Sequence, residues 1–150
     1  MINVDTGSVF IYENNIELSP ALSRDNFIQL YPQNSVKQIR DMNNGYIWYD
    51  LKEKIYPNDN QIAISLCFAP NGYLQHIHIY PQYYGTEVNR SWSDWSPEDM
   101  ERDKEYCNNW LTRYCGLKNS FNQYSWGELS SFSDPRSCTS GIIINYVKRA

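Results

Sequence analysis

The sequence has little positive charge and no long apolar run, and each shortage removes a class of function. Its 150 residues hold 13 lysines and arginines against 17 acids, which gives a net charge of −4 and a pI near 5.1. A protein that binds nucleic acid phosphates is usually basic, so we expect no direct nucleic-acid partner. No apolar run approaches the roughly 20 residues that span a bilayer, so we expect no membrane partner either.

The chain also lacks the sequence marks of export and of disulfide pairing. Residues 1–5 show neither the basic start nor the apolar run of a signal peptide. The four cysteines, Cys67, Cys107, Cys115 and Cys138, form no CxxC pair. Two cysteines eight positions apart on one helix are separated by roughly 12 Å, which is beyond disulfide reach. We therefore expect reduced thiols and a cytoplasmic location.

Catalytic and cofactor motifs are absent from the sequence. It contains no GxSxG, HExxH, P-loop or GxGxxG pattern. His76 and His78 are the only histidines and project from one face of an expected strand, which Tyr80 continues. A metal site would need further ligands beside them, and the sequence offers none nearby. We therefore expect no catalytic residue, no cofactor and no metal.

An alternative use of this pair remains, because neutral imidazoles so placed can act as an acid and a base. The chain would then be a small hydrolase or phosphodiesterase that uses His76 and His78. A phosphodiesterase also needs cations near its histidines, and residues 61–85 contain no lysine or arginine. This shortage favours a binding protein over an enzyme.

Apolar and aromatic residues are plentiful, and their spacing predicts the fold class. Hydrophobic residues make up 41% of the chain, and Tyr, Phe and Trp number 13, 5 and 5, enough for one domain over residues 1–150. Period-two patterns and turn residues predict strands, while caps at Ser96 and Gly116 bound a helix. The expected elements are a hairpin over 8–18, a helix after Ser23, strands at 46–51, 61–68 and 73–80, the helix from Ser96, and strands at 124–132 and 141–147. Their order is ββ-α-βββ-α-ββ, an α+β domain with a largely antiparallel sheet.

The acidity is concentrated at the start of the second helix. Residues 94–105 hold six acids and two bases, so this segment carries the whole net charge. On a helix Glu98, Glu101 and Glu105 share an outward face, and aromatic residues precede them. Acidic and aromatic side chains together suit a basic protein partner. The predicted partner-binding residues are Tyr83, Trp92, Asp94, Trp95, Glu98, Glu101 and Glu105. The loop aromatics also suit sugar stacking, so a carbohydrate-binding module is a further alternative.

Several segments together give the chain a family resemblance. They are PNGYL at 70–74, WSDWSPED at 92–99, NNWLTRYCG at 108–116 and YSWGELSSFSDPRSCTSGIIINY at 124–146. With these segments, roughly residues 44–147 resemble the small cytoplasmic immunity proteins of bacterial polymorphic-toxin and contact-dependent growth-inhibition systems. The resemblance implies a non-enzyme that binds and neutralises one cognate toxin domain, often a nuclease. It maps no binding residue onto this chain.

Overall fold

The computed structural model describes residues 2–11, 16–52, 54–55, 61–81, 96–134 and 139–147. Within these ranges it contains two α-helices, one 3-10 helix and two antiparallel sheets. The helices are α1 (Arg24–Leu30), α2 (Pro97–Cys115) and the 3-10 helix Gln33–Ser35. The strands are β1 (Ile2–Asn3), β2 (Ser8–Ile11), β3 (Ile16–Leu18), β4 (Val36–Asp41), β5 (Ile47–Leu51), β6 (Lys54–Ile55), β7 (Gln61–Phe68), β8 (Leu74–Pro81), β9 (Phe121–Tyr124), β10 (Gly127–Asp134) and β11 (Thr139–Tyr146).

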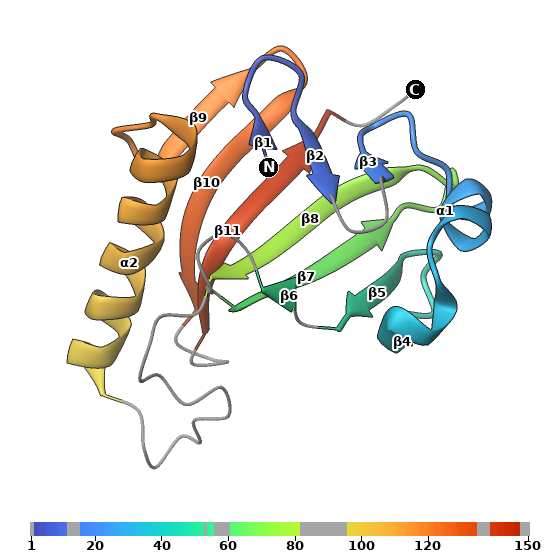
Figure 1. The fold of residues 1–150 in the computed structure, drawn as a ribbon, viewed down its shortest axis with the longest axis horizontal. Coiled ribbons are helices and arrows are strands. Elements are labelled where there is room, and N and C mark those ends of the chain that lie inside the picture. The colour runs from blue at the N-terminus through green and yellow to red at the C-terminus, as the bar shows by residue number, and fades with distance from the viewer. Residues whose placement is uncertain are drawn as a thin grey trace.

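Strand β11 joins the two halves of the large sheet. The strand order is β4-β5-β7-β8-β11-β10-β9, with β6 paired to β7 (Figure 1). On one side β11 pairs with β8, where Ile144 lies opposite Ile77. On the other side it pairs with β10, where Ile144 lies opposite Leu129. The last strand of the sequence is therefore a central strand of the sheet.

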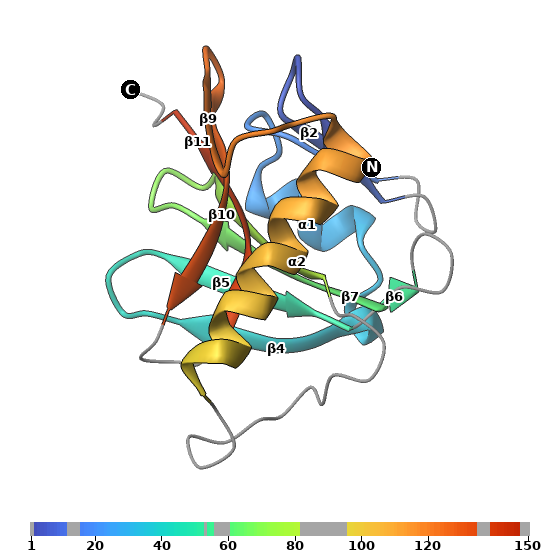
Figure 2. The ribbon, with the colours of Figure 1, turned by 90° about the vertical axis from the view of Figure 1, so that its left-hand side faces the viewer.

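Both helices and the small sheet β1-β2-β3 cover the same face of the large sheet, which we call the core face (Figures 1 and 2). Phe27 of α1 stacks against Tyr31 and meets the rings of Tyr49 and Phe68 at centroid distances of 5.2 and 5.5 Å. Residues of both sheets and both helices form one hydrophobic core. Since side chains alternate along a strand, every second residue of the large sheet points to the other face.

Helix α2 begins and ends where its caps require. The Ser96 hydroxyl accepts a hydrogen bond from the Asp99 N–H at 3.2 Å, and Gly116 ends the helix in the left-handed conformation at φ 70°. Its apolar stripe, Cys107, Trp110 and Leu111, is buried against β10 and β11. This stripe orients the helix and leaves the opposite side in solvent. In the described part of the chain, no helix is long and apolar enough to cross a membrane.

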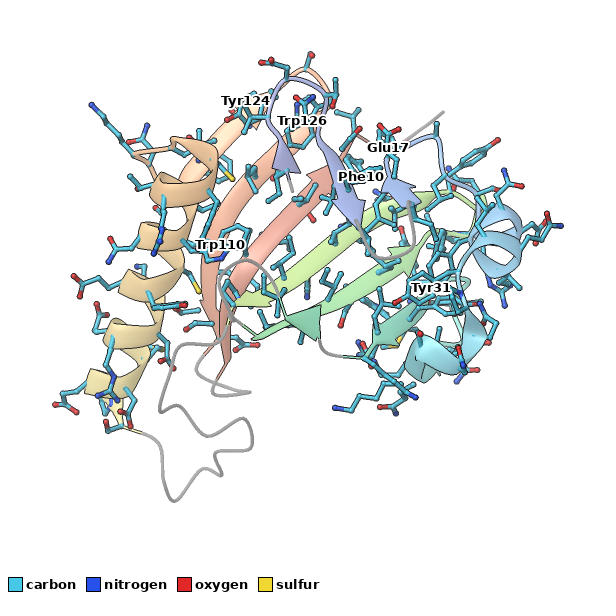
Figure 3. All side chains as sticks on the ribbon, viewed as in Figure 1. Phe10, Glu17, Tyr31, Trp110, Tyr124 and Trp126 are labelled. Atoms are coloured by element: carbon cyan, nitrogen blue, oxygen red, sulfur yellow. The ribbon has the colours of Figure 1, made fainter. Side chains whose placement is uncertain are left out.

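A set of polar contacts fastens the first strands to the last (Figure 3). The Trp126 indole stacks on Tyr124 at 4.9 Å and donates a hydrogen bond to the Val4 carbonyl at 2.9 Å. The Tyr146 hydroxyl donates to the Gly7 carbonyl at 2.6 Å. A Cβ on Gly7 would lie 2.5 Å from the Trp126 ring, so only glycine allows this approach.

The α+β class, the two helices and the antiparallel pairing predicted from the sequence are confirmed. The strands are more numerous than predicted. The run 124–132 was expected to be one strand, but Ser125 and Trp126 form a turn between β9 and β10. Strand β4 was missed because its residues, VKQIRD, lie at a largely solvated sheet edge and show no alternation of apolar and polar side chains.

Three cysteines lie in the described ranges, and all three are free thiols. Burial raises the pKa of Cys67 and of Cys115 to about 11, and that of Cys107 to about 12. A thiol reacts through its thiolate, so these groups are inert near neutral pH. We expect these three thiols to resist alkylation in the native protein, whereas all four cysteines of the chain alkylate in denaturant without reductant. Peptide mass spectrometry measures both states, and two or fewer labelled cysteines in denaturant would contradict reduced thiols.

Candidate functional site

The outward side of α2 carries the three glutamates singled out from the sequence. Glu98, Glu101 and Glu105 are all exposed, as predicted. They line an open hollow of about 710 Å³ together with Pro97, Arg102, Lys104 and Asn108. Arg102 forms an ion pair with Asp99 within the helix, so part of the positive charge here is already engaged. The surface is acidic but interleaved with two cations.

The other four predicted partner-binding residues lie outside the described residues. They are Tyr83, Trp92, Asp94 and Trp95. Their role in partner binding stays a prediction.

A second candidate surface is the side of the large sheet that faces away from the core, which we call the open face. The strand registers place on it Arg40, Trp48, Asp50, His76, His78, Tyr80 and Phe132. The residues between them, such as Ile64, Ile77 and Ile79, point into the core and are buried. The open-face members are only partly buried, so the face is neither sealed nor fully solvated.

Small residues on alternate strands let the large side chains of the open face meet. Trp48 of β5 lies opposite Cys67 of β7, which in turn lies opposite His76 of β8. On β11, a Cβ at Gly141 would lie 3.0 Å from both the Tyr80 and Phe132 rings. Each small residue therefore leaves space for rings from the strands on either side.

The result is a continuous series of ring contacts from β5 to β10. The ring centroids of Trp48 and His78 are 4.7 Å apart, and those of His78 and Phe132 are 5.3 Å apart. Trp48 also stacks on His76, at 6.3 Å and 14°. Tyr80 packs edge-on against Phe132 at 6.2 Å. These contacts hold the rings in fixed positions on strands, which suits a binding surface.

A hydrogen-bonded group of two charged residues and one serine lies at the β4 end of this series. Arg40 donates two hydrogen bonds to the Asp50 carboxylate, each 2.8 Å long, and the Ser65 hydroxyl donates a third at 2.7 Å. Burial alone would raise the pKa of Asp50, but these hydrogen bonds outweigh it and hold the pKa below its usual range. The Arg40 guanidinium also lies over the Trp48 ring, 5.3 Å from its centroid.

The two histidines are parts of this packed surface. His76 Nδ1 is 2.6 Å from Asn145 Oδ1, and His78 Nδ1 is 3.1 Å from the Tyr80 hydroxyl. Burial lowers the pKa of His78 to about 4, with smaller effects from His76 and Arg40, so its imidazole is neutral at pH 7. In the described part of the chain, no three His, Cys, Asp or Glu side chains gather as metal ligands.

The expectation that no cation lies near the histidines is wrong. Residues 61–85 contain no lysine or arginine, yet the histidines do have a cation nearby, because β4 brings Arg40 to the same face. Its Nε and Nη2 donors are both bound to Asp50. The arrangement thus places a guanidinium that is already paired with Asp50 near the neutral imidazole of His78.

Sequence reasoning found only part of the open face. His76, His78 and Tyr80 were placed on one strand face from their spacing, and this is confirmed. Arg40 and Phe132 were missed, since their approach depends on pairing between strands far apart in the sequence. The sequence does contain one signal for this face: aromatic and polar side chains occupy every second position in residues 46–50 and again in 76–80.

The described geometry defines an α+β protein whose large sheet is covered on one face and carries a ring-rich surface on the other. This fold resembles that of one chain in a solved structure described as Rhs1-CT in complex with cognate immunity protein RhsI1. The likeness has a TM-score of 0.63 at 15% sequence identity, and it covers 97% of this chain and 85% of that one. No protein-family model and no curated protein sequence matches the chain.

Proposed function

We propose that this chain is an immunity protein that binds and neutralises a cognate toxin domain. The observation that carries the proposal is the fold shared over 97% of the chain with a chain of a toxin–immunity complex. The resemblance of residues 44–147 to polymorphic-toxin immunity proteins supports it independently of that structure. Of the two roles in such a complex, the acidic net charge and the ring-rich open face favour the binder.

The toxin that fits this chemistry is basic, and we propose that it is a nuclease. A nuclease domain binds phosphates, so its active-site surroundings carry positive charge. The net charge of −4 on this chain is complementary to such a domain. The chain would act as a protein ligand in the cytoplasm, without chemistry of its own.

Protection of cells tests the function directly. The proposal predicts that a gene beside this one encodes the toxin domain, and that domain is expressed in cells with and without the chain. We expect cells that express the toxin domain to survive only when they also express the chain. We also expect the two purified proteins to form a stable complex. Survival without the chain, or protection without any complex, would contradict the proposal.

The acidic face of α2 gives a separate prediction about association. Replacing Glu98, Glu101 and Glu105 together by Gln should slow association with the toxin domain by about 10-fold at low salt and flatten its salt dependence, because exposed charges steer encounter. Dissociation should change little. Binding kinetics at two salt concentrations measure both rates.

A control variant removes the same amount of charge elsewhere. Glu17, Asp25 and Asp41 are exposed residues on other elements, and replacing them by their amides gives the same net charge. If this control slows association as much as the α2 variant does, the net charge steers the partner and the α2 face has no special role.

A further inference from the structure

Arg40 shows how the open face recognises a cation. Its guanidinium lies 5.3 Å from the Trp48 ring centroid while donating two 2.8 Å hydrogen bonds to Asp50. A ring and a carboxylate side by side are the two groups that a guanidinium contacts best. The surface therefore already holds one arginine side chain in this way.

The same two kinds of group continue across the sheet. Toward β10 the rings are Tyr80 and Phe132, and the strand register places Glu128 and Asp134 on this face. Glu128 is partly exposed, and its described contact is a long 3.5 Å hydrogen bond from Gln123. Asp134 is two residues after Phe132 on the same face, so a second cation could meet a ring and a carboxylate here, as Arg40 does on β4 and β5. Glu128 lies four residues before Phe132, opposite Asn145, and places a further carboxylate at the other end of β10.

Charge on the open face favours a cationic occupant. In the part of the chain that the structure describes, Asp50, Glu128 and Asp134 share this face with Arg40, and Lys37 lies at the β4 bulge beside it. Three carboxylates and two cations leave the described part of this face with a net charge of −1. The rings stand on paired strands and contact one another, so they are already ordered before binding. Little side-chain entropy is therefore lost when a partner binds.

We propose that the open face is the docking surface for the toxin domain and receives a segment of that domain rich in arginine or lysine. This inference rests on the proposed function. The cationic side chains pack on the exposed parts of Trp48, Tyr80 and Phe132, while Asp134 and Glu128 provide counter-charges at the two ends of β10. Because α2 packs on the core face (Figures 1 and 2), its glutamates lie outside this contact.

Two open-face variants and one matched control test the proposal by binding kinetics against the adjacent gene's toxin domain. Trp48→Ala removes a central ring and should raise the dissociation rate by about 100-fold. Glu128→Arg reverses one charge on this face and should raise the dissociation rate by about 10-fold. Glu17→Arg makes the same charge change on the small sheet, on the core side (Figure 3), and should leave the dissociation rate unchanged.

The outcomes separate this inference from the function itself. If the unaltered chain neither binds nor protects, the proposed function fails. If it binds and Glu128→Arg and Trp48→Ala both bind equally well, the toxin docks elsewhere and this inference is overturned. If Trp48→Ala does not fold, the dissociation rates of Glu128→Arg and Glu17→Arg are compared instead, and equal rates overturn this inference. Self-association of the unaltered chain that Glu128→Arg abolishes would instead assign the face to a second copy and overturn the proposal.

Discussion

Replacing Gly127 by Ala should lower the free energy of unfolding by at least about 4 kcal/mol, or prevent folding altogether. The residue opens β10 at φ 147°, and a Cβ there would lie 1.9 Å from the Asn145 carbonyl oxygen and 2.9 Å from the Tyr146 Cα. Both neighbours are backbone atoms of the central strand β11, so neither can move without breaking the ladder. The cost combines backbone strain with lost pairing.

Gly72 provides the matched control, because it also has positive φ, at 87°, but a Cβ there would meet nothing within 4 Å. Gly72→Ala should cost about 1–2 kcal/mol, the strain of the left-handed region alone. Chemical denaturation of both variants at one temperature measures the difference. Equal losses would show that close approach at Gly127 does not constrain the fold.

Acidification should destabilise the protein through His78. Its pKa falls from 6.5 to about 4 in the folded state, chiefly because the ring is buried. The fold therefore holds the neutral imidazole, while the unfolded chain accepts a proton below about pH 6.5. The contribution of His78 to the free energy of unfolding is fully present above pH 6.5 and decreases as the pH falls toward 4. At about 1.4 kcal/mol for each tenfold change in proton affinity, the whole loss amounts to about 3 kcal/mol.

His78→Gln should remove this part of the pH dependence. The unfolding free energy of the variant and of the unaltered chain, measured by denaturant titration from pH 7.5 to 4, should converge as the pH falls. The pKa of Asp50 lies below its usual range in the folded state, and its share of the acid destabilisation is present in both proteins, so it cancels in the comparison. A variant that loses stability in parallel with the unaltered chain would show that His78 is not the group responsible.

The parts of the fold that the sequence predicts are those set by near neighbours. Ser96, Gly116 and the stripe of Cys107, Trp110 and Leu111 define α2 within 20 residues or so, because capping and helical periodicity are local. The β7–β8 hairpin is equally local, since the turn at 70–72 directly joins its strands. These elements were correctly predicted to within a residue or two.

The open face could be predicted only in part, because it depends on which strands pair. Arg40 and Phe132 are 92 positions apart in the sequence, and nothing in either local segment indicates that both lie on the sheet face that carries Trp48 and His78. The sequence predicts an acidic face on α2, because the acids there form a local excess within residues 94–105. A surface assembled from β4, β5, β8 and β10 leaves no such local excess.

The central position of β11 has a consequence for how the protein is made. While the ribosome is still synthesising residues 139–146, β8 has no neighbour on that side, and the β9–β10 hairpin with α2 has no sheet to join. The native sheet closes only when this segment has left the exit tunnel, through long-range pairings such as that of Ile79 with Ile142, which are 63 positions apart. Pairing of β11 is thus the step that completes the sheet, and a nascent chain halted before residue 139 exposes two unpaired strand edges to chaperones and proteases.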